Sequence, residues 1–108
     1  MDMHTAVQSL DALAHETRLG VFRLLVQAGP DGLSAGDIAA QMGALQNTMS
    51  SHLTKLGRAG IVTSERDGRH IIYRADFAAL SGLILYLMED CCGRQAELCA
   101  PIAAAIKC

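Results

Sequence analysis

The sequence has no tryptophan and few aromatic residues, two Phe and two Tyr among 108 residues. Its hydrophobic half, 51% of the residues, therefore consists mainly of Leu, Ile, Val, Ala and Met, which predicts a core of packed helices. A chain of this length has room for one domain, so we assign residues 1–108 to a single domain. Such a small domain buries only about 60–70% of its unfolded surface. Together with a mean hydropathy of +0.25, this favours an oligomer.

Long apolar runs and a secretory opening are also absent. The longest apolar-rich stretch, 77–88, is shorter than the roughly 20 residues that a transmembrane helix needs. The opening Met1-Asp2-Met3-His4 is polar and acidic, unlike a signal peptide. We therefore expect a cytoplasmic protein with no membrane partner, in which the four cysteines are reduced.

Signatures of catalysis are missing as well. The sequence contains no C-x-x-C pair, no Gly-rich phosphate loop and no His–Asp pair near its cysteines. A chain this short also leaves little room for a substrate cleft. We therefore expect no enzymatic activity, in preference to a thiol oxidoreductase or a metalloid-transforming enzyme. A protein-interaction module that does not bind DNA is a third class, and absence of salt-dependent duplex binding would favour it.

Basic residues are few, nine against eleven acidic ones, but they are concentrated in one segment. Residues 45–74 carry five basic and two acidic side chains, whereas both flanking segments are net negative. Local charge, and not the average, determines whether a surface can contact phosphates. The middle of the chain is therefore the candidate nucleic-acid-binding region.

Four stretches have apolar residues at helical spacing: 4–14, 16–28, 34–42 and 46–58. The apolar residues at this spacing are Val7, Leu10 and Leu13/Ala14 in the first, Leu19, Phe22, Leu25 and Val26, widened by Val21 and Leu24, in the second, and Met49, Leu53 and Leu56, the expected inward face, in the fourth. Gly29-Pro30-Asp31-Gly32 ends the second helix. Ser34, with Asp37 three residues later, resembles the capped start of the third helix.

The period then changes from helix to strand. The runs 61–66 and 69–74 flank Asp67-Gly68, a favoured pair for a two-residue hairpin turn because both turn residues need a positive φ. Asp76 caps a last long helix with Phe77, Leu80, Leu83, Ile84, Leu87 and Cys91 at helical spacing, and Pro101 could begin one more turn through Ile106. The order α-α-α-α-β-β-α predicts a mainly helical winged helix-turn-helix with a β-hairpin wing.

In such a fold the second helix of the pair enters the major groove of DNA. The helix 46–58 opens with amide and hydroxyl side chains that can bond base edges or phosphates, and Lys55 and Arg58 follow on later turns. Arg66 and Arg69 lie on either side of the hairpin tip. The spacing alone leaves an ordinary solvated face as an equal alternative.

A resemblance favours DNA binding. The run Ser50-Ser51-His52-Leu53-Thr54-Lys55-Leu56-Gly57-Arg58-Ala59-Gly60-Ile61-Val62 resembles the S-x-H-L-x-x-L-x-x-A-G-(L/I)-V signature of the ArsR/SmtB family of metal-responsive repressors. The run Leu13-Ala14-His15-Glu16-Thr17-Arg18-Leu19 resembles that family's opening, and Arg66-Asp67-Gly68-Arg69 with Tyr73 resembles its wing. The resemblance covers residues 10–90. It implies a homodimer that represses from an inverted-repeat operator until a metal or metalloid binds.

The resemblance also implies roles for particular residues. Residues 34–74 would read DNA, with Gln46, Asn47, Thr48 and Ser51 as the base-reading set and Ser50 and His52 as the pair on the DNA backbone. We add Lys55, Arg66 and Arg69 as phosphate or minor-groove contacts. His52 could instead be a packed polar residue on its helix.

The terminal helices, 4–14 and 76–92, are the expected dimer interface. Leu83, Ile84, Leu85 and Leu87 cover more than one face of the last helix, so one face can pack on the first helix while another meets a symmetry mate. Two recognition helices must enter successive major grooves about 34 Å apart. The interface therefore controls how well the dimer fits its operator.

All four cysteines lie at the C-terminal end, Cys91, Cys92, Cys99 and Cys108. The segment lacks the cysteine or histidine spacings of zinc sites, and a site of thiolates alone selects a soft centre. Adjacent Cys91 and Cys92 project about 100° apart on a helix, so the helix must loosen at Gly93 and residues 93–98 must form a loop that brings Cys99 back.

The tail 91–108 is thus the expected ligand-binding part, with Cys91, Cys92 and Cys99 as ligands and Cys108 as an uncertain fourth. It resembles the arsenic-responsive members of the family, which implies As(III) as the inducer of an arsenic-resistance operon. Sb(III), Cd(II), Pb(II) or a methylated arsenical are alternatives, as is a thiol redox switch through Cys92 and Cys99.

Overall fold

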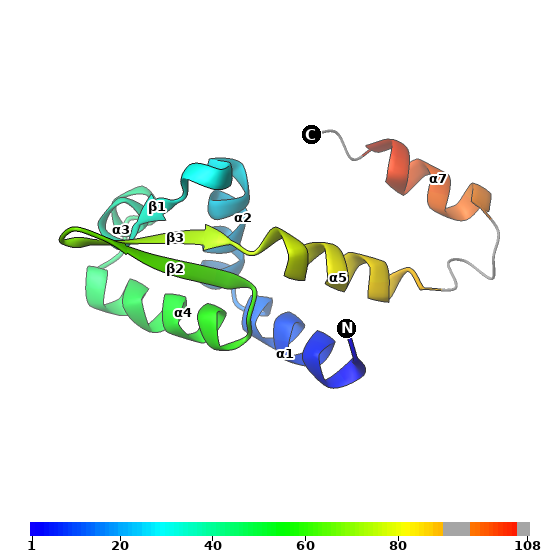
Figure 1. The fold of residues 1–108 in the computed structure, drawn as a ribbon, viewed down its shortest axis with the longest axis horizontal. Coiled ribbons are helices and arrows are strands. Elements are labelled where there is room, and N and C mark those ends of the chain that lie inside the picture. The colour runs from blue at the N-terminus through cyan, green and yellow to red at the C-terminus, as the bar shows by residue number, and fades with distance from the viewer. Residues whose placement is uncertain (90–95, 106–108) are drawn as a thin grey trace.

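The computed structural model describes residues 1–89 and 96–105, with only the backbone described at 96–99 and 103 (Figure 1). The elements are α1 (Met3–Leu13), α2 (Glu16–Ala28), the 3₁₀ turn η1 (Gly29–Asp31), β1 (Leu33–Ser34), α3 (Ala35–Met42), α4 (Gln46–Arg58), β2 (Val62–Asp67), β3 (His70–Ala75), α5 (Phe77–Leu87) and α7 (Ala96–Ala105). The predicted mainly helical fold with a β-hairpin wing is confirmed.

The helix pair α3–α4 begins and ends where its capping residues predict. The Ser34 hydroxyl accepts the Asp37 N–H at 3.1 Å and so satisfies one of the unpaired donors of the first turn of α3. Gly43 ends α3 with a left-handed φ of 64°, a conformation that glycine adopts without steric cost. Leu45 precedes α4 without a side-chain cap.

The core joins α2, α3 and α4 to the base of the hairpin. Its most deeply buried large side chains are Val21, Leu25, Ile38, Met49, Leu53, Leu56 and Ile61. The inward face predicted for α4 is therefore confirmed. In α2 the predicted apolar stripe supplies Val21, Phe22 and Leu25 to the core, whereas Leu19, at the edge of that stripe, is 45% exposed.

The wing is part of a three-stranded antiparallel sheet in the order β1-β3-β2. The sequence missed β1, because two residues are too few to display an alternating pattern; it pairs Leu33 with Tyr73 and Ser34 with Ile72. The predicted turn is also shifted by one residue. Asp67 pairs with His70, so the loop is Gly68-Arg69, and Gly68 supplies the positive φ of 62°.

Helix α1 has two apolar sides, and the predicted stripe divides between them, because Leu13 packs against the core whereas Val7 and Leu10 lie on the exposed side. Ala6, Ser9 and Ala12 are buried, whereas Val7 is 54% and Leu10 is 43% exposed. Small side chains allow α1 to pack closely on its neighbours, and the larger side chains point outward.

The C-terminal helices differ from the prediction at their ends. Helix α5 ends at Leu87, and residues 90–92 lie outside the described part of the chain. Helix α7 begins at Ala96, so residues 96–98 do not belong to a loop and Pro101 lies inside a helix instead of starting one. Ala, Glu and Leu are good helix formers and favour this helix, although Pro101 lacks the N–H for a bond to the Glu97 carbonyl and its ring crowds that carbonyl. Within the described ranges, no helix combines the length and apolarity needed to cross a bilayer.

Two glycines of the turn before β1 provide a matched test of how tightly the wing packs. Gly29 and Gly32 both have a left-handed φ, 68° and 67°. A Cβ on Gly29 would meet nothing within 4 Å, but a Cβ on Gly32 would lie 2.5 Å from the Tyr73 carbonyl oxygen. We expect Gly32→Ala to lower the free energy of unfolding by at least about 1 kcal/mol more than Gly29→Ala, because it adds overpacking to backbone strain. Chemical denaturation at one protein concentration measures both, and equal losses would contradict this packing.

Candidate nucleic-acid interface

Helix α4 has one apolar and one polar side. Met49, Leu53 and Leu56 are at most 1% exposed and face the core. At 100° per residue, the opposite side of the helix carries Asn47, Ser51, Thr54 and Arg58. The predicted DNA-contacting residues of α4 other than His52 are all exposed: Gln46, Asn47, Thr48, Ser50, Ser51 and Lys55.

Hydroxyl groups on this polar side bond to their own helix. Ser50 donates its hydroxyl proton to the Gln46 carbonyl at 3.0 Å, and Thr54 donates to the Ser50 carbonyl at 2.9 Å. A phosphate oxygen is an acceptor and needs a donor. The predicted phosphate contact of Ser50 therefore requires its hydroxyl to rotate away from the helix. At the start of α4, the Asn47 side-chain oxygen accepts the Thr48 N–H at 2.9 Å.

His52 is half-buried and packs against α2. Its ring centroid lies 4.8 Å from that of His15, which caps α2 by accepting the Thr17 N–H at its Nδ1. Burial lowers the pKa of His52, and the nearby positive charge of Arg18 lowers it further. The imidazole is therefore neutral at pH 7. This placement agrees with a packed polar residue, and a contact of His52 with the DNA backbone stays a prediction.

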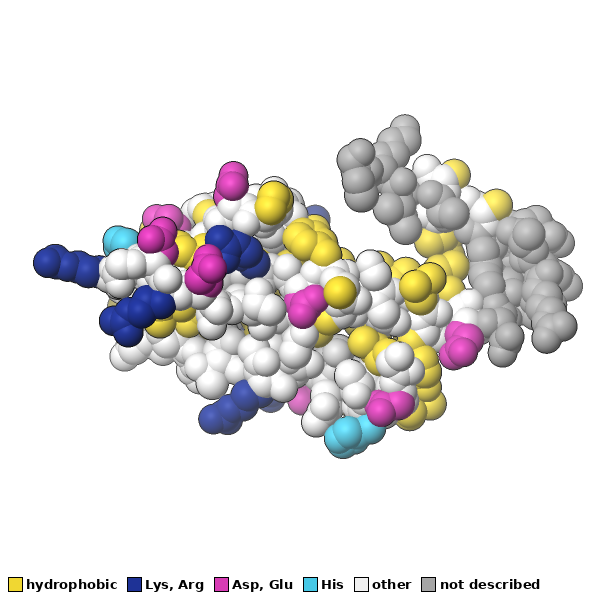
Figure 2. Space-filling view, in the orientation of Figure 1, with side chains coloured by type: hydrophobic (Ala, Val, Ile, Leu, Met, Phe, Trp, Pro, Cys, Tyr) yellow, Lys and Arg dark blue, Asp and Glu magenta, His cyan; other side chains and the backbone are white. Residues whose placement is uncertain are grey.

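The wing places two cations beside the start of α4. Arg66 lies on β2 and Arg69 lies in the two-residue loop, and both are exposed. The wing tip and the beginning of α4 lie at the same end of the molecule (Figure 1), where basic side chains gather on the surface (Figure 2). Arg66 Nε donates to the Gly68 carbonyl at 3.4 Å.

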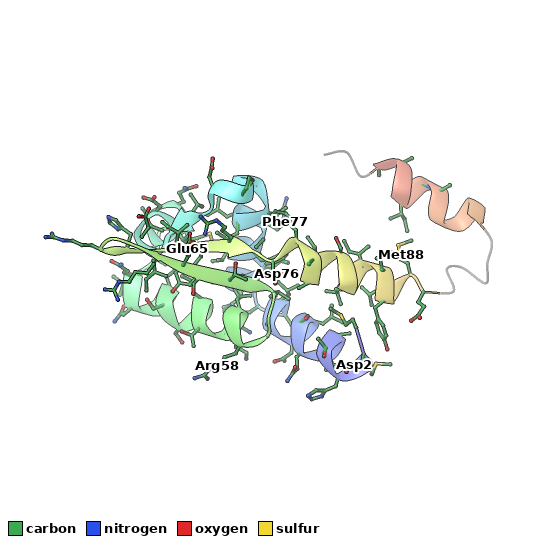
Figure 3. The ribbon with its side chains drawn as sticks, viewed as in Figure 1. Asp2, Arg58, Glu65, Asp76, Phe77 and Met88 are labelled. Carbon is green, nitrogen blue, oxygen red and sulfur yellow. The ribbon has the colours of Figure 1, made fainter. Side chains whose placement is uncertain are left out.

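Arg74 belongs to the basic segment, but its contacts stabilise the base of the wing. Its Nε donates to the Pro30 carbonyl at 2.7 Å, and its Nη1 bonds Glu65 Oε1 at 3.1 Å. Figure 3 shows Glu65 at the hairpin. This pair of contacts ties both wing strands to the turn that follows α2. Arg74 therefore fixes the wing relative to the helix pair, and Glu65 compensates its charge.

The sequence analysis missed Thr54 on the polar side of α4 and named Arg58 only as a residue of a later turn, outside the assigned contact set. Thr54 and Arg58 follow Asn47 by seven and eleven residues, so they lie on the same side of the helix. Figure 3 shows Arg58 on the side of α4 that faces away from the sheet.

A second surface lies at the opposite end, on α1 and α5. Met3, Val7 and Leu10 form an exposed stripe on α1, at 66%, 54% and 43% exposure. On α5 only Leu83 is buried, whereas Phe77, Ile84, Leu85 and Leu87 are exposed. Figure 2 shows this apolar surface running along the two helices. Exposed apolar patches of this kind mark interaction sites.

The predicted thiolate site lies largely outside the described residues. Cys91, Cys92 and Cys108 lie outside the described residues, and for Cys99 the structure describes only the backbone, which lies in α7. Among the side chains that the structure describes, no group of three His, Cys, Asp or Glu residues could hold a metal ion. The assignment of Cys91, Cys92 and Cys99 stays a prediction.

Comparison with known proteins places this arrangement among regulators. A family model described as a helix-turn-helix domain matches residues 13–65, from the end of α1 into β2. The HTH-type transcriptional regulator YgaV of Escherichia coli is 30% identical over 87 residues, which cover 81% of this chain and 86% of YgaV.

Solved structures agree. A homodimeric winged helix-turn-helix domain from Mycobacterium bovis, described as a possible ArsR-family regulator, has 27% identity and a TM-score of 0.65, and the match covers 82% of each chain. The antimony-specific repressor AntR has 33% identity and a TM-score of 0.60, over 75% of this chain and 72% of AntR. A "possible transcriptional regulator for arsenical resistance" has 30% identity and a TM-score of 0.62, over 93% of this chain and 98% of its own.

The two contacts of Arg74 can be separated by substitution. Arg74→Ala removes both and should lower the free energy of unfolding by about 1 kcal/mol or more, with faster amide hydrogen exchange in β1 and β3. Glu65→Gln keeps an acceptor and loses only an exposed charge pair, so its effect should be small. Arg74→Lys keeps the charge, but its three N–H donors lie on one nitrogen, which cannot occupy the positions of both Nε and Nη1, so it should resemble Arg74→Ala. A loss on Glu65→Gln as large as that on Arg74→Ala would show that the Pro30 bond is not the one that matters.

Proposed function

Because the chain belongs to the ArsR/SmtB family of winged helix-turn-helix transcriptional regulators, we propose that it is a homodimeric repressor of an arsenic-resistance operon, released from its operator when As(III) binds its C-terminal cysteines. One observation carries the proposal. A polar, cation-flanked recognition helix at one end of the molecule is joined to an uncovered apolar surface at the other. The first surface suits DNA and the second suits another copy of the chain.

The DNA-binding part of the proposal rests on α4 and the wing. The N-terminal turns of α4 carry Gln46, Asn47, Thr48 and Ser51 into the major groove, where amides and hydroxyls discriminate between bases. Arg66 and Arg69 at the wing contact phosphates or the minor groove. Phosphate contacts position the protein, and base contacts give it sequence preference.

The homodimer rests on the exposed stripe of α1 and the exposed side of α5. A two-fold axis pairs the same patch on both subunits, so one apolar surface is enough to make the interface. Two recognition helices then read the half-sites of an inverted repeat, about 34 Å apart. The similar domain from M. bovis is a homodimer with a winged helix-turn-helix fold, and this supports the assembly.

The inducer rests on the chemistry of the donors. Three cysteine thiolates at 91, 92 and 99, without zinc-type spacing, match a soft three-coordinate centre such as As(III). Cys91 follows the last residue of α5 by four positions, so a ligand there acts next to the dimer surface. The relatives described for arsenical resistance and for antimony support a metalloid inducer. Bound As(III) would hold the three sulfurs together and lower the affinity for DNA.

The dimer surface can be tested with two leucines of similar exposure. Leu85 on α5 is 71% exposed and Leu45 before α4 is 74% exposed. We expect Leu85→Asp to shift the protein from dimer to monomer in sedimentation velocity, because it places a charge in the apolar interface. Leu45→Asp, at the other end of the molecule, should remain dimeric. A dimer that survives Leu85→Asp together with Val7→Asp would contradict the interface.

Arsenite titration tests the inducer site. With duplexes selected from random sequence by the wild-type protein, arsenite should weaken binding by about 5- to 150-fold, as read by fluorescence anisotropy. Cys91→Ser, Cys92→Ser and Cys99→Ser should each abolish most of this release while still binding DNA without arsenite. Cys108→Ser serves as the comparison, and antimonite is titrated in parallel.

Three outcomes would contradict the proposed site, its mechanism or its inducer. If all three serine variants release DNA as readily as the wild type, the ligand assignment is wrong. Release by peroxide without metalloid, reversed by a dithiol, would instead indicate a redox switch. Release by Cd(II) or Pb(II) but not by arsenite would retain the thiolates and change the inducer.

A further inference from the structure

We propose that a groove between α1 and α4 seats a phosphodiester of the DNA backbone, as a contact separate from the base-reading turns and from the wing. This inference rests on the proposed DNA binding and extends it to residues outside the predicted set. The groove has a volume of about 700 Å³. Its charged and hydroxyl-bearing lining comprises Asp11, Arg18, Ser51, Thr54, Lys55 and Arg58.

The groove is continuous with the polar side of α4. Ser51, Thr54 and Arg58 line it and also lie on the side of α4 opposite the core. Helix α4 has 13 residues and is about 20 Å long, whereas the major groove is about 12 Å wide. With its first turns among the base edges, its last turns must lie over the phosphate backbone. The α1–α4 groove opens at those last turns.

The lining has an excess of positive charge. Three cations, Arg18, Lys55 and Arg58, face one carboxylate, that of Asp11. The Arg18 Nε donates to the Ala12 carbonyl at 2.6 Å, which holds the side chain across the corner between α1 and α2. That bond does not use the two terminal NH₂ groups of the guanidinium, which can donate to an acceptor. Guanidinium, ammonium and hydroxyl donors in one hollow suit a phosphodiester.

Asp11 works against the same anion. Its carboxylate lies 3.8 Å from Lys55 Nζ, and the two side chains are 71% and 50% exposed. Such an exposed pair is weak, so an arriving phosphate can replace Asp11 as the partner of Lys55. The carboxylate then remains near the bound phosphate and repels it. Removing this negative charge should therefore strengthen DNA binding, whereas removing a groove cation should weaken it.

Variants that remove charges of opposite sign should change the affinity for DNA in opposite directions, and this makes the test discriminating. Arg58→Gln removes a groove cation, Asp11→Asn removes the groove carboxylate, and Arg69→Gln removes the wing cation. Arg23→Gln is the matched control, because Arg23 is an exposed arginine of α2 that does not line the groove. Each variant is compared with the wild-type dimer on a 40-bp duplex of random sequence, since phosphate contacts do not depend on sequence. Circular dichroism melting checks that every variant is folded.

The measured quantity is the slope of log affinity against log salt between 50 and 200 mM, about −0.9 per phosphate contacted. Arg58→Gln should make the slope less negative by about 0.9 for each groove of the dimer that is engaged. Arg23→Gln should leave the slope unchanged, and Asp11→Asn should tighten binding.

The possible failures can be told apart. A normal slope for Arg58→Gln, with a reduced slope for Arg69→Gln, would overturn the groove contact and leave DNA binding intact. No salt-dependent binding by the wild type to any duplex would overturn the proposed function as well. Saturable binding of inorganic phosphate that Arg58→Gln abolishes, without a change in the duplex slope, would assign the groove to a free anion and overturn the DNA contact.

Discussion

The packing of one side of α4 against α2 and α3 is the constraint on which the rest of the molecule depends. Met49, Leu53 and Leu56 are almost completely buried, so the rotation of α4 about its own axis is fixed. That rotation alone decides which side chains meet solvent on the opposite side. The hairpin is attached to the same core through Ile61 and Val62, so the wing tip and the start of α4 are held at the same end. The apolar residues that α4 buries therefore determine which of its polar residues are available to nucleic acid.

Helix α1 contributes to the exposed apolar surface and also contacts the recognition helix α4. Its small residues, Ala6, Ser9 and Ala12, pack inward, its larger ones face outward, and Asp11 reaches Lys55 of the recognition helix. A shift of α1 at a subunit interface would therefore be felt at α4 without passing through the hydrophobic core. The exposed side of α5 continues that apolar surface as far as Leu87. Helix α1 thus gives a direct contact between the apolar surface and the recognition helix.

Most of the fold could be predicted from the sequence, because capping residues, glycines and apolar spacing act locally. Ser34, Gly43 and the strand-forming runs around Gly68 placed the elements of the DNA-reading part to within a residue or two. Position on the helix surface was harder. The spacing of Val7 and Leu10 predicted a helix but not the side on which they lie, because a pattern cannot distinguish a face that packs on its own chain from one left exposed. The role of Arg74 was hidden because its partners are 9 and 44 residues away in sequence.

The residues that connect the wing to the helix pair differ in how freely they can be substituted. Arg74 donates to a main-chain carbonyl at position 30, and every amino acid has that oxygen. Any residue that preserves the turn can therefore replace Pro30 without removing the acceptor, and loss of Glu65 removes one of two partners. Position 74 has no such freedom, since few side chains can donate in two directions. The position of the wing therefore depends on one arginine, whereas its partners can vary in sequence.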